Sequence, residues 1–360
     1  MSRKALGVYV GIALSIMAML LIDACVEDRL LSPDGGDSDA EYTVFYGGAE
    51  AAPPTGYYTY GISTKTGEPI DTFVFEMPSY RKVIFSNDGS NIIMSRSWLK
   101  IIDYESKEVI AENNQYATHC ARLNATGDLL LVSDGYPFVV FSYPDLTPIL
   151  VEDITVSYGG FLPQDRHAFY IKNGKDSLYV LNFTDPDNVL TSQHYIGGSV
   201  MAAEVTPDGA KLVILQTFYG DPKSNIKVYN TNDFALEEEL EIPDRFYGGM
   251  TIHPDGNRIF LHQAAPSAQY ISLIDVYSID ANTISGFITQ DDIDSPHQFY
   301  PTQIAFTPDG RNAVILSFYP MSSTSTLIIT DALSKAIIIQ LDSPPAGAEC
   351  IAVRPVDISK

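Results

Sequence analysis

Short apolar runs alternate with turns rich in Asp, Gly and Pro along the chain after residue 40. One unit recurs: an apolar residue, any residue, Pro or a small residue, then Asp-Gly, then a further apolar run. Asp-Gly supplies the positive φ of a tight antiparallel turn, and Pro sets the entry to that turn. Each copy therefore predicts a β-hairpin. The full copies are residues 205–209 (VTPDG), 252–256 (IHPDG) and 306–310 (FTPDG), and the weaker ones are 85–89 (FSNDG), 123–127 (LNATG) and 161–165 (FLPQD).

The copies recur at a regular distance. Their last positions, 89, 127, 165, 209, 256 and 310, are 38, 38, 44, 47 and 54 residues apart. A four-stranded propeller blade takes about 40–50 residues. Further apolar runs at 99–103, 138–141, 226–229, 274–277 and 327–330 fit third strands, and no segment after residue 40 shows a long helical period. The pattern predicts an all-β chain with six complete blades.

The two ends of this region complement each other. Residues 351–357 fit the first strand of a unit, and residues 42–46, 57–62 and 70–76 fit a second, third and fourth strand. Joining them makes a seventh blade and removes the exposed sheet edges of an open array. We therefore expect a seven-bladed β-propeller over residues 41–360, closed by one C-terminal strand and three N-terminal strands.

The N-terminus has the layout of a secretory signal peptide. Arg3 and Lys4 precede an uncharged apolar run over 5–22, and the segment ends Ile22-Asp23-Ala24-Cys25. These residues resemble a bacterial lipoprotein box, in which the Cys is acylated, although Asp23 stands where that family prefers a small residue. The resemblance implies a signal peptide over 1–24 and lipidation of Cys25; an uncleaved membrane anchor and an ordinary cleaved signal are the alternatives.

The segment after Cys25 differs in composition from the rest of the chain. Residues 25–40 are acidic and Gly-rich, which predicts a flexible tether. Its acidic start also resembles the surface-export signal of Bacteroidetes lipoproteins. We expect a lipid-anchored protein of the cell envelope, at the outer membrane, facing either the surface or the periplasm.

Charge limits the partners of the chain. The formal net charge is −23, from 45 acids against 22 Lys and Arg. Such a charge repels nucleic acid and anionic lipid surfaces, so contact with the membrane is expected only through the lipid. Many of the aspartates stand in turns, where they also favour solubility. Besides Cys25 only Cys120 and Cys350 occur. They fall in blades two apart in the ring, so no disulfide is expected between them.

The repeat resembles the YVTN-type and lactonase-like propeller repeats, whose signature is the same x-Pro-Asp-Gly hairpin before an aliphatic strand. The resemblance covers residues 41–360 and implies the fold. That superfamily includes enzymes, ligand-capture lipoproteins and proteins of no known role, so it implies no single function. Three of the seven units carry the complete Pro-Asp-Gly.

Tyrosine gathers on one predicted face of the ring. In an antiparallel blade the 1–2 and 3–4 turns lie on one face, and the 2–3 loops and the links between blades lie on the other. Tyr offers a broad apolar ring and a hydroxyl, which suits recognition, but it is also a good strand-packing residue. The candidates for ligand binding are Tyr80, Tyr116, Tyr158, Tyr195, Tyr247 and Tyr300 in the links, and Trp98, Tyr136, Phe218, Tyr219, Phe318 and Tyr319 in the 2–3 loops.

Polar residues near the axis form a second candidate set. Lys82, Arg122, Glu204, Thr251 and Gln303 lie one or three residues before the apolar position of the motif, and His119 is close by. Mixed charge there could hold a polar ligand, or the groups could satisfy one another or bind water.

Catalytic and metal signatures are weak. Glu204, Arg122 and His119 are the visible candidates for an acid–base set, and no nucleophile elbow, metalloprotease helix or Walker loop occurs. The aspartates at 185, 187, 291, 292 and 294 have the oxygens for calcium without its loop pattern, so solvated acidic loops are expected. No metal, no cofactor and no catalytic residue is assigned, and His253 is expected to be structural.

Three functions remain open. The first is ligand capture by the Tyr-rich face, where the ligand is a small molecule, a glycan or a protein. The second is a lactonase-like hydrolase, and the third is a protein-assembly scaffold that uses the same face.

Overall fold

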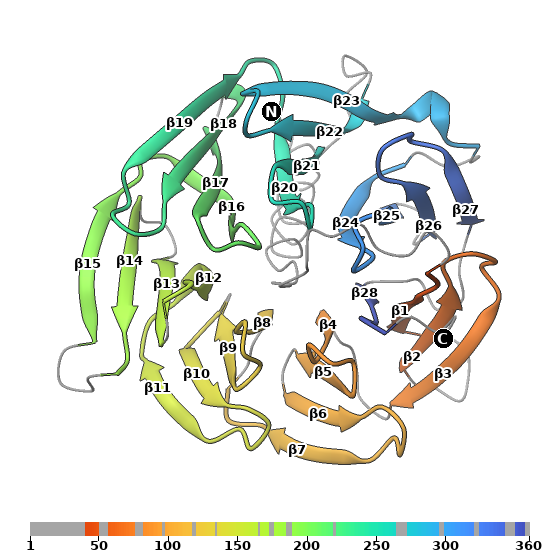
Figure 1. The fold of residues 1–360 in the computed structure, drawn as a ribbon, viewed down its shortest axis with the longest axis horizontal. Coiled ribbons are helices and arrows are strands. Elements are labelled where there is room, and N and C mark those ends of the chain that lie inside the picture. Colours follow the sequence, from red (N-terminus) through yellow and green to blue (C-terminus); the bar gives the residue numbers. More distant parts are fainter. Residues whose placement is uncertain are drawn as a thin grey trace, which may run out of the picture.

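The computed structural model confirms the seven-bladed propeller (Figure 1). It describes residues 40–49, 57–75, 82–95, 98–116, 120–133, 135–164, 166–172, 176–184, 189–218, 221–263, 272–294, 299–319, 324–342 and 350–356. The predicted signal peptide and almost all of the predicted tether lie outside these residues. No helix in the described ranges is long and apolar enough to cross a membrane.

Six blades each use four consecutive antiparallel strands. The described strands of these blades are β4 (Lys82–Phe85), β5 (Asn91–Ser95), β6 (Leu99–Asp103) and β7 (Val109–Asn113); β8 (Cys120–Leu123), β9 (Leu129–Ser133), β10 (Phe138–Ser142) and β11 (Pro148–Glu152); β12 (Val156–Phe161), β13 (His167–Lys172), β14 (Ser177–Asn182) and β15 (Leu190–Tyr195); β16 (Ser199–Val205), β17 (Lys211–Phe218), β18 (Asp221–Asn230) and β19 (Leu236–Ile242); β20 (Tyr247–Ile252), β21 (Arg258–Gln263), β22 (Ser272–Ser278) and β23 (Thr283–Thr289); and β24 (Pro301–Phe306), β25 (Asn312–Tyr319), β26 (Thr324–Asp331) and β27 (Ile337–Asp342). The only helical element of the described ranges is the 3₁₀ turn η1 (Gln290–Asp292).

The seventh blade is closed by both ends of the chain, as predicted. Strand β28 (Cys350–Val353) pairs with β1 (Thr43–Ala49), which continues into β2 (Tyr57–Ser63) and β3 (Pro69–Phe75). The register places Val353 opposite Val44 and Ile351 opposite Tyr46. Side chains of this blade pack on both neighbours: Val44 joins a cluster with Leu327 of β26, and Phe45 joins one with Phe85 of β4. The ring is therefore closed by pairing and by packing.

The core lies between the blades. The inner strand β8 and its neighbour β9 are buried at every residue, whereas the outer strand β15 alternates between exposed and half-buried positions. This gradient follows from the architecture, because inner strands are covered on both faces by neighbouring blades and outer strands have one edge in solvent.

The residues of the Asp-Gly turn are required by the turn itself and also by the packing of neighbouring blades. The turn Asp accepts a hydrogen bond from the backbone N–H two residues later, as in Asp208 to Ala210 and Asp309 to Arg311, at 3.0 and 3.1 Å. The turn Gly has φ near +70°, and it also faces the turn of the preceding blade. A Cβ at Gly209 would lie 2.5 Å from Pro163 Cβ. Blade spacing, as well as the turn itself, thus requires glycine there.

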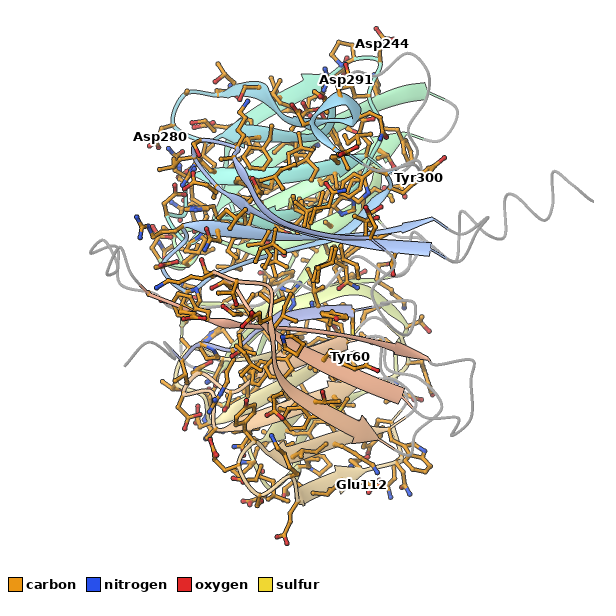
Figure 2. The ribbon with its side chains drawn as sticks, turned by 90° about the vertical axis from the view of Figure 1, so that its right-hand side faces the viewer. Tyr60, Glu112, Asp244, Asp280, Asp291 and Tyr300 are labelled. Atoms are coloured by element: carbon orange, nitrogen blue, oxygen red, sulfur yellow. The ribbon has the colours of Figure 1, made fainter. Side chains whose placement is uncertain are left out.

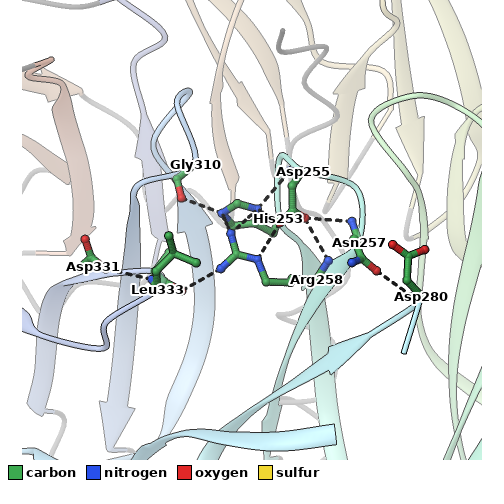
Figure 3. Close-up of polar contacts among 9 residues, drawn as sticks. His253, Asp255, Asn257, Arg258, Asp280, Gly310, Asp331 and Leu333 are labelled. Atoms are coloured by element: carbon green, nitrogen blue, oxygen red, sulfur yellow. Dashed lines mark hydrogen bonds and ion pairs between the residues drawn. The ribbon is translucent and has the colours of Figure 1, made fainter. Parts of the chain in front are cut away.

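The side chain of His253 also connects the turns of two neighbouring blades. Its Nε2 is 2.7 Å from the carbonyl oxygen of Gly310 in the next turn, and its Nδ1 accepts from the Asp255 backbone N–H at 3.1 Å (Figure 3). Arg258 donates to Asp255 Oδ2 at 2.7 Å and to the Ala332 carbonyl oxygen at 3.0 Å. These bonds agree with the predicted structural role of His253.

Replacing two equivalent glycines separates the effect of the positive φ from the effect of the close approach of the neighbouring blade. Gly209 and Gly256 both have φ of +74°, but a Cβ at 256 would have its nearest neighbour, Pro207 Cδ, at 3.7 Å. We expect Gly256→Ala to lower the free energy of unfolding by about 1–2 kcal/mol through backbone strain alone. Gly209→Ala should lose about 2 kcal/mol more through overlap with Pro163. Chemical denaturation checks this, and equal losses in the two variants would contradict the role of blade spacing.

Candidate functional site

The two faces of the ring differ as the blade topology requires. The turn face carries the 1–2 and 3–4 turns, and the loop face carries the 2–3 loops and the links between blades. Figure 2 shows the ring from the side, with Tyr300 of a link on one side and Asp280 of a 3–4 turn on the other. The sequence candidates fall on the loop face or on the inner strands.

The tyrosines predicted to lie in the links differ in position and in burial. The prediction of a link was wrong for three of them, because Tyr158 lies in β12, Tyr195 ends β15 and Tyr247 begins β20. Tyr158 and Tyr247 are buried, Tyr116 and Tyr300 are half-buried, and Tyr195 is 76% exposed; Tyr80 lies outside the described residues. The Tyr158 hydroxyl donates to the backbone oxygen of Met201 in the next blade, and Tyr116 packs against Phe141 with ring centroids 5.8 Å apart. The buried rings hold blades together, so a ligand-binding surface has to be built from the exposed ones.

The 2–3 loops contribute two exposed rings. Trp98 is 40% and Tyr136 is 53% exposed. Phe218 ends β17, and Phe318 with Tyr319 ends β25, whereas Tyr219 lies outside the described residues. Among the aromatic side chains whose exposure the structure describes, Trp98, Tyr136 and Tyr195 are the exposed ones. All of them lie on the loop face.

A hydrogen bond orients the side chain of Tyr136. Its hydroxyl donates to Asp153 Oδ1, in the link that follows β11. The hydrogen bond to Asp153 raises the pKa of Tyr136, so the hydroxyl stays protonated and continues to donate. Asp153 was not a candidate from the sequence. An Asp in a polar link gives no pattern, and its closeness to Tyr136 arises only when β10 and β11 pair.

The inner-strand candidates bind neighbouring backbone. Glu204 Oε2 accepts from the Ile252 N–H at 3.0 Å, and Gln303 Oε1 accepts from the Ile351 N–H at 3.1 Å. Thr251 Oγ1 donates to the Ile304 carbonyl oxygen at 3.2 Å. Each bond joins one inner strand to the inner strand of the next blade. These contacts support a structural role for the three side chains.

Arg122 and Lys82 occupy the same ring of strands. Arg122 is 2% exposed, and its guanidinium lies over Gly160 of the next blade, where a Cβ would be 3.2 Å from Nη1. Lys82 begins β4 and is half-buried, and His119 lies outside the described residues. The absence of a side chain at Gly160 leaves room for the guanidinium between two blades.

A buried acid anchors the link before β20. Asp275 in β22 is 1% exposed, and its Oδ2 accepts from the Tyr247 hydroxyl at 2.6 Å and from Arg245. Burial, followed by the charge of Asp275, raises the pKa of Tyr247 far above its usual range. Asp275 was not among the candidates from the sequence. Its signal was an acid within the apolar run of β22.

The structure describes some of the cysteines and of the acidic residues that were considered for a disulfide and for calcium binding. Cys350 is buried and forms no disulfide, which agrees with the expectation that it is not bonded to Cys120. Asp292 accepts from Thr289 at the start of η1, while Asp185 and Asp187 lie outside the described residues. No group of three or more metal-ligating side chains occurs in the described ranges.

Comparison with known proteins gives the fold. No profile of a known family and no curated protein sequence matches the chain. Two solved structures described as putative 6-phosphogluconolactonases are similar to it. The one from Bacteroides fragilis is 15% identical, covers 89% of this chain and 99% of its own, and has a TM-score of 0.64. The one from Bacteroides uniformis is 14% identical, covers 88% and 100%, and has a TM-score of 0.63.

A hydrazine synthase structure from Kuenenia stuttgartiensis is also similar, with 14% identity, 76% and 89% coverage and a TM-score of 0.61. The likeness is one of fold. At these identities the activities of the three proteins do not transfer to this chain.

Buried His262 predicts a pH dependence of stability. Burial between blades lowers the pKa of this ring to about 4, against about 6.5 for an exposed imidazole. The unfolded ring takes up a proton near pH 6.5 and the folded ring only near pH 4, so stability falls as the pH drops through this window and levels below it. The loss amounts to about 3 kcal/mol.

The matched control is His262→Gln, which removes the titrating group. Denaturation of both proteins from pH 7.5 to 4 gives the difference in their free energies of unfolding. We expect this difference to shrink as the pH falls. A constant difference would show that His262 titrates normally in the folded state.

Proposed function

We propose that this chain is a lipid-anchored binding protein of the cell envelope that captures a ligand on the loop face. The observation that carries the proposal is that Trp98, Tyr136 and Tyr195, the exposed rings among the aromatic side chains whose exposure is described, all lie on that face. Exposed Trp and Tyr supply large contact area at small cost in conformational entropy, and they dominate binding energy at recognition surfaces.

The inner strands favour binding over hydrolysis. A lactonase-like reaction would need Glu204 or Arg122 to act on a substrate. Glu204 instead accepts a backbone hydrogen bond that ties β16 to β20, and Arg122 is buried over Gly160. The hydrolase therefore stays the second candidate, supported by the fold of the two Bacteroides structures. A scaffold role would use the same rings and would appear as a protein partner.

Replacing the exposed rings tests the binding face. The full chain is screened by calorimetry against a metabolite set, neutral glycans and purified envelope proteins. Trp98→Ala and Tyr136→Ala should each weaken the ligand found by about tenfold, because an aromatic anchor contributes about 1–3 kcal/mol. Leu333→Ala is the matched control, since Leu333 is 75% exposed but lies in a 3–4 turn of the turn face. Unchanged affinity in both ring variants would remove this face from the binding site.

The proposed lipid anchor is attached at Cys25, in the segment Ile22-Asp23-Ala24-Cys25. A cleaved and acylated protein should incorporate labelled palmitate and fractionate with membranes. Cys25→Ser should lose the label and should not be processed as a lipoprotein. A wild-type protein that stays in the membrane without label, at the mass of the full chain, would indicate an uncleaved anchor. A wild-type protein that is shortened, unlabelled and soluble would indicate an ordinary signal.

A further inference from the structure

The outermost strand of six blades begins with the same β-bulge. Its register to the third strand skips the second residue, which is left without a cross-strand partner. In order around the ring, the residues at this position are Ile338, Ile70, Ile110, Ile149, Thr191 and Glu237. All six are exposed, and the isoleucines are 44%, 42%, 48% and 37% exposed in that order. Isoleucine therefore stands at one exposed position in four consecutive blades, and we call these four residues the isoleucine row.

The fold does not require isoleucine at this bulge. Thr191 and Glu237 occupy it in two blades with the same register. These two blades also expose one leucine each, Leu190 and Leu236, and a single apolar side chain on a surface is ordinary. In the remaining blade the skipped residue is Phe287, which is buried. A general preference of isoleucine for strands does not explain why it fills the position in consecutive blades.

The outer parts of these blades contact one another. A Cβ at Gly67, in the turn before β3, would lie 3.1 Å from Ile339 of β27. Lys107, in the turn before β7, binds Asp71 of β3 at 2.7 Å. Figure 1 shows β27, β3, β7 and β11 following one another around the rim of the ring. The isoleucine row is thus an arc on neighbouring strands, and it lies near the turn face, because each outermost strand begins there.

The chain enters the ring within this arc. Ala40 and Glu41 are the first described residues and lead into β1, in the same blade as Ile70. Ala40 packs on the same hydrophobic cluster as Ile339 of β27. The proposed tether over residues 25–40 spans at most about 50 Å when fully extended. A lipid on Cys25 would therefore hold this side of the ring close to the membrane.

The charge around the row limits what can cover it. In residues 64–71, 103–112, 143–152 and 331–342, which contain the turns and strands of the row, ten acids stand against three lysines. Such a surface repels anionic lipid, and it also repels a second copy of this chain, which brings the same acids. Zwitterionic headgroups carry no net charge, and their ammonium groups can face the carboxylates.

From these observations we infer that the isoleucine row lies on a zwitterionic lipid surface, with its side chains at the boundary between headgroups and acyl chains. This inference rests on the membrane anchor proposed above. The net charge alone predicts contact through the lipid only, and the row adds an apolar contact that a neutral surface does not oppose. The anchor keeps the ring near the surface, so four modest contacts are enough to orient it. The loop face then points away from the lipid and stays open to a ligand.

Tryptophan fluorescence tests the contact position by position. The chain has one tryptophan, Trp98, which lies on the loop face. Reporters are Ile70→Trp and Ile110→Trp, each combined with Trp98→Phe. The full chain, as its host processes it, is reconstituted in vesicles of phosphatidylcholine, part of which is brominated on its acyl chains. We expect quenching of both reporters to be about threefold stronger than quenching of the native Trp98.

The matched control is Thr191→Trp, also combined with Trp98→Phe. It places the reporter at the same bulge in a blade outside the row, and it should be quenched as weakly as Trp98. In the Ile110→Trp reporter, adding Ile70→Ser and Ile338→Ser should lower the quenching about twofold. Equal quenching at positions 70 and 191, or no effect of the two serines, would overturn the inference. Thermal melts establish that each variant is folded.

The design separates this inference from the proposed function. If the chain floats with the vesicles but no reporter in the row is quenched more than Thr191→Trp, the row does not contact lipid and the anchor stands. If the chain does not associate with vesicles, the anchor and the row both fall. Ligand binding on the loop face is measured by calorimetry and does not depend on either result.

Discussion

The structure depends on lateral contact between the inner strands. An antiparallel four-stranded sheet leaves two edges, and a single blade cannot bury its own faces. Here each blade buries the next one's core, and polar side chains tie the inner strands in sequence, as Glu204 does to Ile252 and Gln303 does to Ile351. The second of these bonds reaches β28, the short C-terminal strand that closes the ring. Side chains that look like a polar channel lining therefore also set the spacing of the blades.

The fold was predictable because its signal is local and repeated. A tight turn needs glycine at positive φ, and an Asp that accepts from the backbone N–H two residues later stabilises that turn. Both requirements are therefore visible as residue types in the sequence. Closure was predictable for a related reason: the ends carry the missing strands of one blade, and pairing of Val353 with Val44 satisfies both edges. Even so, the contact of Gly209 with Pro163 could not be read from the sequence, because it depends on how closely two turns approach.

The candidate site was less predictable, for the opposite reason. Tyr158 in β12, Tyr195 at the end of β15 and Tyr247 at the start of β20 all stand close to a junction between blades, yet Tyr195 is 76% exposed and the others are buried. The burial of each ring depends on which side chains lie opposite it. Tyr247 is drawn inward because Asp275, 28 residues later, accepts its hydroxyl. Tyr136 stays outside because its partner, Asp153, lies at the rim of the same blade. Burial of this kind is tertiary information, and a repeat pattern does not contain it.

The two faces of the ring hold their acids in different ways. On the turn face an aspartate such as Asp208 or Asp309 is used locally, because the N–H of its own turn donates to the carboxylate. On the loop face Asp153 instead binds a tyrosine hydroxyl, which adds no positive charge. The repeat thus fixes acids of the turn face within their own turns, whereas an acid of the loop face such as Asp153 is placed by a tertiary contact that the repeat does not specify.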